Sequence, residues 1–140
     1  MNFQNIRYEI DKERNEKPNL KVLIYWAIIS LLGIIIIRIF IRPKRYHLSE
    51  TFDFLQGTLP NFFAGAIFCV LAFVYYRAFF GNKNSIIGRL TFAFLFSFLG
   101  LTLWEYIQYL MGYPIDLFDI IMTGIGNMFT IIIILLLRIK

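Results

Sequence analysis

The sequence predicts an all-α, polytopic integral membrane protein with four transmembrane helices, and three observations carry this prediction. The chain of 140 residues is 59% hydrophobic and only 16% charged, whereas soluble domains average about 25% charged residues. A soluble domain of this size could not bury so much apolar side chain. The apolar residues also gather in four stretches of about 20 residues, the length that spans a hydrocarbon core. A soluble enzyme, a disordered chain and a disulfide scaffold are therefore excluded.

Each span must be a helix, because an open strand leaves backbone groups unpaired in lipid. The predicted spans are residues 20–41, 60–80, 90–111 and 117–137. We interpret the first as a retained anchor rather than a signal peptide, because no small-residue cleavage pattern closes it. Residues 1–19 form a polar leader with four acids. This leader is predicted to be cytoplasmic, as a solvated tail or as a short amphipathic helix on the membrane surface.

A short helix is predicted before the second span. The segment 47–59 is too polar to cross a membrane and too apolar for an ordinary loop. Ser49 can cap such a helix and Gly57 can end it. The helix would lie on the membrane surface or re-enter it, as a lid that carries His47, Glu50 and Asp53. With a single histidine these residues make a poor metal site, so we expect neither a metal nor a cofactor.

The distribution of Lys and Arg predicts the orientation. With four spans, the leader, the region of the loop 81–89 and the C-terminus share one side, and they carry ten basic residues. The opposite side carries four. Because basic residues favour the cytoplasmic side, both termini are predicted to be cytoplasmic, in a bacterial inner membrane. The basic residues flank the apolar segments instead of forming one stripe, so no nucleic-acid partner is expected.

The polar residues converge on one face of the membrane. In a four-span chain the loop between the first two spans shares a face with the loop between the last two, whichever way the chain is oriented. All acids outside the leader lie near these loops: Glu50, Asp53, Glu105, Asp116 and Asp119. The sequence therefore predicts a polar site at this face.

Glu105 is the most informative of these residues. It lies six residues before the expected helix end at Met111, hence about 9 Å from it, where a carboxylate is costly to insert. Gln108 follows at i+3 on the same helix face, so the two can form one hydrogen-bonding unit. The pair is interpreted in two ways that stay open: a structural clamp to a neighbouring helix, or a ligand-binding group.

The fourth span places a second polar stripe beside it, with Asp119, Thr123, Gly126 and Asn127 on one helix face. Asp119 can cap the helix or bind a ligand. Gly126 and its neighbour Gly124 favour close helix packing, and Asn127 an interhelical hydrogen bond. The candidate ligand-binding residues are Glu105, Gln108, Asp116, Asp119 and Thr123.

The motif Glu105-Tyr-Ile-Gln108, followed by Pro114-Ile-Asp116-Leu-Phe-Asp119-Ile-Ile and then Gly126, resembles the end of VanZ-like proteins, a family of small bacterial membrane proteins. The resemblance covers roughly residues 59–133. Thr123 stands where many members carry Asn, and the arginine often found in their acidic turn is missing before Asp119. The resemblance implies an influence on the cell envelope without a defined reaction.

Three functions are compatible with these sequence features. The first is a protein that binds a lipid headgroup or cell-wall precursor at the acidic site. The second is an accessory or scaffold subunit that packs on membrane protein partners. The third is an enzyme for a lipid-linked substrate, with Glu105 or Asp119 as general base. Because no nucleophile motif, phosphate loop or Cys/His cluster is present, the enzyme is disfavoured; the first function is favoured, with the second as its close alternative.

Overall fold

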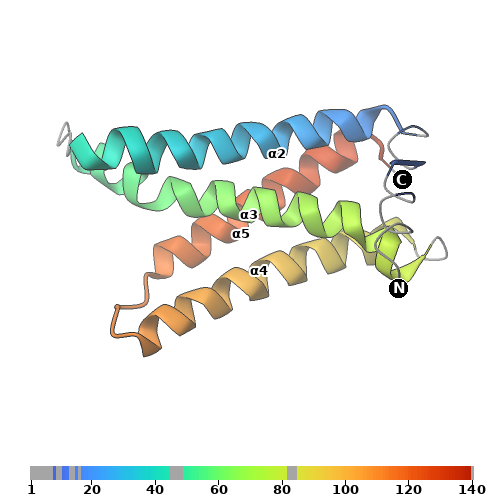
Figure 1. Ribbon diagram of the computed structural model, residues 1–140. Helices are drawn as coiled ribbons and strands as arrows, with labels where there is room; N and C mark the ends of the chain where they lie inside the picture. The colour runs from blue at the N-terminus through green and yellow to red at the C-terminus, as the bar shows by residue number, and fades with distance from the viewer. Residues whose placement is uncertain are drawn as a thin grey trace.

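The computed structural model describes residues 8, 11, 12, 15, 17–44, 49–81 and 85–139, and these contain four long helices (Figure 1). The helices are α2 (Asn19–Ile35), α3 (Glu50–Phe80), α4 (Ile86–Leu110) and α5 (Leu117–Leu136). α2 continues into the π-helix η1 (Ile36–Ile41) and the 3-10 helix η2 (Arg42–Lys44). Four helices are long and apolar enough to cross a membrane, which confirms the predicted fold. Most of the leader, with its predicted surface helix, lies outside the described residues.

The second span differs from its prediction. We expected a separate short helix ending near Gly57 and a span beginning at Pro60, but α3 is one helix of 31 residues. It begins after Ser49 as predicted, and the Ser49 side chain accepts a hydrogen bond of 3.2 Å from the Phe52 amide. At 1.5 Å per residue α3 is about 46 Å long, which exceeds a hydrocarbon core of about 30 Å. Its first turns are therefore an extension of the span.

The continuity of α3 through Pro60 depends on Arg42. A proline lacks the amide that would bond the carbonyl four residues earlier, here that of Gln56, and its ring displaces the preceding turn. The Arg42 guanidinium supplies the missing donor, because its Nε atom lies 3.2 Å from the Gln56 carbonyl oxygen. Its Nη2 atom lies 3.0 Å from the carbonyl oxygen of Gly57. These charge-assisted bonds compensate for the proline inside the helix.

α3 is the central helix, and α5 is its closest neighbour. In its most apolar stretch 50% of α3 is buried, compared with 17% for α2 and for α4. Two glycines bring the backbones of α3 and α5 together. A Cβ atom added at Gly126 would overlap the backbone of Phe62, and one added at Gly65 would lie 2.5 Å from the Thr123 carbonyl oxygen. The predicted role of Gly126 in helix packing is confirmed.

Buried polar side chains connect the helices inside the bundle. The Ser97 hydroxyl of α4 shares its one proton between the Gly65 carbonyl oxygen, at 3.1 Å, and the side-chain oxygen of Asn127, at 2.8 Å. Trp26 of α2 donates from Nε1 to the Thr130 hydroxyl over 3.0 Å. Such bonds hold helices together in lipid, where apolar surface alone gives no preference for another helix. The predicted interhelical hydrogen bond of Asn127 is confirmed.

The third span begins earlier than predicted, and Arg89 lies inside it. Ser85 caps α4 by accepting a bond of 3.2 Å from the Gly88 amide. Arg89, which the charge distribution assigned to a loop, is only 6% exposed. Its Nε atom donates to the Phe73 carbonyl oxygen over 2.8 Å, and its guanidinium carbon lies 3.8 Å from the centre of the Phe73 ring. This cation–π contact holds α4 against α3 at the end of α4 far from Glu105.

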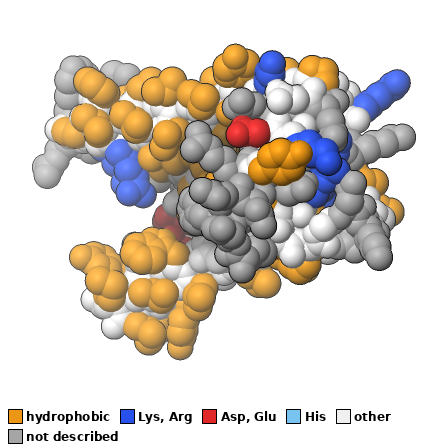
Figure 2. Space-filling view, turned by 45° about the vertical axis from the view of Figure 1, so that its right-hand side comes forward, with side chains coloured by type: hydrophobic (Ala, Val, Ile, Leu, Met, Phe, Trp, Pro, Cys, Tyr) orange, Lys and Arg blue, Asp and Glu red, His pale blue; other side chains and the backbone are white. Residues whose placement is uncertain are grey.

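The helices separate toward the opposite end of the bundle. α2 and α3 run side by side, whereas α4 and the first half of α5 lean away from α2 (Figure 1). Figure 2 shows a hollow between two lobes on this side, with basic side chains on one lobe and acidic atoms at its base. We call the end of the bundle that carries Glu105, Asp116 and Asp119 the acidic end. Asp116 is exposed there, and Glu105 and Asp119 are half-buried.

The Arg42 contact predicts a thermodynamic coupling with Pro60. Arg42→Ala leaves the Gln56 carbonyl without its donor, so we expect the free energy of unfolding to fall by about 1–2 kcal/mol. In a Pro60→Ala background the restored amide can bond Gln56, and Arg42→Ala should then cost about 1 kcal/mol less. A double-mutant cycle measured by circular dichroism during denaturation in detergent tests this. Arg38→Ala is the matched control, and an equal cost of Arg42→Ala in both backgrounds would contradict the compensation.

The glycines of the bundle should differ in their tolerance of a side chain. Gly65→Ala and Gly126→Ala force the α3 and α5 backbones apart, so each should lower the free energy of unfolding by about 2 kcal/mol or more. An added Cβ at Gly100 meets nothing within 4 Å. Gly100→Ala should therefore be neutral or stabilise the protein by up to about 1 kcal/mol through helix propensity. Thermal unfolding in one detergent compares the three, and similar losses at all positions would refute the packing argument.

Candidate binding site at the acidic end

Two aspartates open α5, and their roles are distinct. Asp116 caps the helix, because its Oδ1 atom accepts a hydrogen bond of 2.9 Å from the Phe118 amide. The interpretation of Asp119 as the N-cap is therefore wrong: the helix begins one residue after Asp116, and Asp119 lies within its first turn. Thr123 is buried, and its hydroxyl donates to the Asp119 backbone carbonyl over 2.9 Å. The Asp119 carboxylate takes no part in this cap.

Glu105 and Gln108 form the hydrogen-bonded pair that their spacing predicts. The Gln108 side-chain nitrogen donates to Glu105 Oε1 over 3.2 Å near the end of α4. Both side chains are half-buried. An amide donor beside a half-buried carboxylate stabilises the charged form while leaving its other oxygen able to accept a further bond. The pair can therefore hold a ligand that offers hydrogen-bond donors.

The carboxylates of α4 and α5 lie near one another. Asp116 and Asp119 are close enough to Glu105 for their negative charges to act on it. The short connection between the two helices produces this proximity, because α5 starts seven residues after α4 ends. Like charges gathered in a partly desolvated site disfavour one another. The site is accordingly complementary to a cationic group.

Asp119 also faces α3 and the end of the first span. The Asn61 side chain lies within hydrogen-bonding reach of the Asp119 carboxylate, and the charges of Arg38 and Arg42 act on it. Asp119 Oδ1 is buried with no hydrogen-bond partner within the described part of the chain. The two arginines supply the positive charge that the turn before Asp119 lacks. The acidic end therefore combines carboxylates with guanidinium groups.

Sequence reasoning did not assign Arg38 and Arg42 to the site. It treated Arg38 as a residue that reaches the interface and Arg42 as part of a basic cluster. Their spacing of four residues at the end of the first span places both on one helix face. This spacing is the signal from which a shared target could have been predicted. The identity of that target, Asp119 in the last helix, depends on the tertiary packing.

The predicted lid is part of α3. Glu50 and Asp53 lie in its first turn, and Asp53 Oδ1 accepts a bond of 2.7 Å from the Gln56 side chain. The Phe54 ring packs edge-on against Phe118, with centroids 5.2 Å apart, so this extension of α3 contacts the start of α5. His47 lies outside the described residues. Among the described residues, no group of three His, Cys, Asp or Glu side chains is placed to hold a metal ion.

Because Asp116 caps α5, loss of its hydrogen-bond acceptor and loss of its charge should have different effects on stability. Asp116→Ala removes the acceptor for the Phe118 amide and should lower the free energy of unfolding by about 1 kcal/mol. Asp116→Asn keeps an acceptor at the same place and should change stability by less than about 0.5 kcal/mol. Denaturation in detergent gives both values. An equal loss in the two variants would show that the charge, and not the cap, carries the stabilisation.

Comparison with known proteins adds no relative to this description. No family model, no curated protein and no solved structure matches the chain. The resemblance to VanZ-like proteins therefore stays a prediction.

Proposed function

We propose that this multi-pass membrane protein binds a cell-envelope component or lipid headgroup at the acidic end. The observation that carries the proposal is the hydrogen-bonded pair of Glu105 and Gln108 on α4, placed where the negative charges of Asp116 and Asp119 at the start of α5 act on Glu105. Three helices thus contribute polar groups to one place, since Asn61 of α3 reaches Asp119. A purely structural clamp needs only two complementary partners. The surplus of carboxylates favours a ligand.

The chemistry of the site favours binding over catalysis. Its described groups are carboxylates, side-chain amides and guanidinium groups. Carboxylates accept hydrogen bonds from ammonium or hydroxyl groups, and guanidinium groups match phosphate oxygens. Outside bulk water these contacts are stronger than at an exposed surface. An envelope component or lipid with both cationic and anionic groups suits this mixture.

We further propose that the acidic end faces outward from a bacterial cytoplasmic membrane. The ten basic residues predicted on the other side support this orientation. On the acidic side, Arg42 is engaged by backbone carbonyls of α3. A guanidinium whose donors bond these carbonyls is fixed to α3 and is stabilised at this end of the bundle. The resemblance to VanZ-like proteins supports the envelope as the source of the ligand.

Replacement of Glu105 tests the proposal. Glu105→Gln keeps the size of the side chain and a hydrogen-bond acceptor for Gln108, so the free energy of unfolding should change by less than about 0.5 kcal/mol. Loss of the charge should weaken retention of a bound component by about tenfold or more, as expected for one charge-assisted hydrogen bond. The measurement is native mass spectrometry of protein purified from its source membrane in mild detergent or in native nanodiscs.

Glu50→Gln is the matched control, because it removes a carboxylate from the exposed first turn of α3. It should leave retention unchanged. The scaffold interpretation predicts a different result: stoichiometric partner proteins in the purified sample and a lower unfolding temperature for Glu105→Gln, without a lost ligand. That result would replace the binding proposal.

A further inference from the structure

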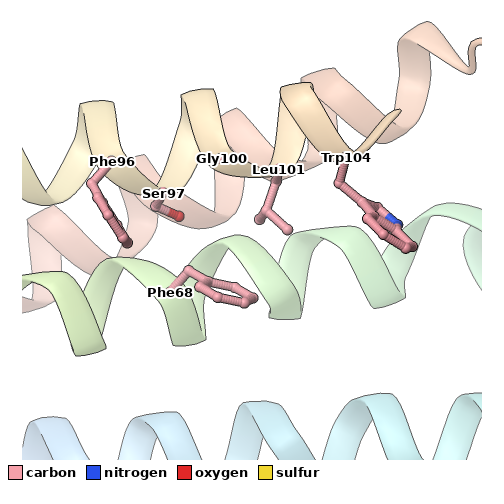
Figure 3. A pocket seen from close by; sticks show the side chains of 6 residues that line it. All are labelled: Phe68, Phe96, Ser97, Gly100, Leu101 and Trp104. Carbon is pink, nitrogen blue, oxygen red and sulfur yellow. The ribbon is translucent and has the colours of Figure 1, made fainter. Parts of the chain in front are cut away.

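An apolar groove runs along the surface between α3 and α4. Its main part has a volume of about 420 Å³ and is lined by Phe68, Phe96, Ser97, Gly100, Leu101 and Trp104. Figure 3 shows side chains of α4 directed toward α3 on both sides of the gap left at Gly100. Phe68, Phe96 and Trp104 are each about half exposed, so the groove opens on the outside of the bundle. In a membrane this surface faces lipid.

The groove continues along the same two helices. A second hollow of about 300 Å³ shares Phe68 and Phe96 with the first and reaches Tyr75 and Phe79. From Phe92 to Trp104 the groove follows twelve residues of α4, a length of about 18 Å at 1.5 Å per residue. One leaflet of the hydrocarbon core is about 15 Å deep. The groove is thus long enough to hold an acyl chain below Trp104.

The groove is lined almost entirely by apolar atoms. A single hydrocarbon chain is thin enough to lie there. The lining suits it, because the Ser97 hydroxyl is turned inward to Gly65 and Asn127.

Gly100 creates the depth of the groove. Gly65 and Gly126 are required by close backbone contacts, but a Cβ atom at Gly100 would meet nothing within 4 Å. Glycine in a helix costs about 1 kcal/mol relative to alanine. No described neighbour of Gly100 requires the absence of a side chain. The open space is therefore what the glycine provides.

The groove ends beside the acidic site. Trp104 lines its end, Glu105 is the next residue, and Gln108 lies one turn further on the same helix. Tryptophan is enriched where lipid chains meet headgroups. The described charges acting on Glu105 are negative, those of Asp116 and Asp119, whereas Arg38 and Arg42 act on Asp119. A headgroup at this place meets carboxylates for an ammonium group and guanidinium groups for a phosphate.

We infer that the groove between α3 and α4 binds one acyl chain of an aminophospholipid whose primary ammonium group is held by Glu105. This inference rests on the proposed function and names the ligand class. The length and apolar lining of the groove suit a lipid chain, and the charges at its end suit a zwitterionic headgroup with hydrogen-bond donors. A phosphatidylethanolamine meets both requirements, whereas a phosphatidylcholine has the same charges without the ammonium donors.

Two variants test the binding of the acyl chain and the binding of the headgroup separately. The protein in detergent is titrated with phosphatidylethanolamine or phosphatidylcholine of identical chains, and bound lipid is counted by native mass spectrometry. The unchanged protein should prefer phosphatidylethanolamine by about tenfold, the value of one charge-assisted hydrogen bond. Gly100→Leu fills the groove and should reduce retention of both lipids at least tenfold. Glu105→Gln should remove the preference and keep the chain-dependent binding.

Leu99→Phe is the control for Gly100→Leu, because it adds bulk on an exposed face of α4 outside the lining of the groove. It should leave binding unchanged. If Gly100→Leu fails to fold, Gly100→Ala gives a graded test with a smaller loss for both lipids. Circular dichroism and gel filtration establish that each variant is folded.

The outcomes distinguish the two proposals. Unchanged lipid retention in folded Gly100→Leu and Gly100→Ala overturns the groove inference. If Glu105→Gln still releases an envelope component in that case, the proposed function stands without it. Loss of lipid in Gly100→Leu with an unaltered preference in Glu105→Gln overturns the role of the acidic end in both proposals. A second copy of the chain retained at the groove in place of lipid also overturns the inference.

Discussion

The close approach of α3 and α5 determines where the polar groups of these two helices lie at the acidic end. With no side chain at Gly126, the α5 backbone reaches that of Phe62, and with none at Gly65, the α3 backbone reaches the Thr123 carbonyl oxygen. This contact sets the register of the two helices. On the side of the contact toward the acidic end, the Asn61 side chain reaches Asp119. A larger residue at either glycine would shift one helix along the other and separate this pair.

α4 is attached to this pair of helices at separated points. Ser97 bonds Gly65 and Asn127 near the middle of the bundle, and Arg89 holds Phe73 at one end. Beyond Ser97, toward Glu105, no side-chain hydrogen bond to α3 is present among the described residues. Buried polar contacts are the specific attractive forces between helices in lipid. Their uneven distribution along α4 explains why the helix leans away and why an apolar groove opens beside it.

The sequence was sufficient for features that depend on local pattern. Apolar stretches of the right length predicted four spans, and the i+3 spacing predicted the bond between Gln108 and Glu105. The sequence did not predict features in which a residue distant along the chain changes the local secondary structure. Pro60 normally marks a helix start, and only the donors of Arg42 allow α3 to continue through it. The same distance in sequence hid the influence of the Arg38 and Arg42 charges on Asp119, and the choice between Asp116 and Asp119 as cap required the true start of α5.

The bond from Arg42 to α3 has a consequence for the way the chain enters the membrane during synthesis. A guanidinium at the end of α2 has no acceptors on its own helix comparable to the Gln56 and Gly57 carbonyls. Those carbonyls belong to a segment that is translated later. Moving the first helix into lipid by itself leaves a charge uncompensated, which carries a cost. We therefore expect the two helices to insert together as a hairpin, in which the Arg42 guanidinium bonds the Gln56 carbonyl that Pro60 leaves without a donor.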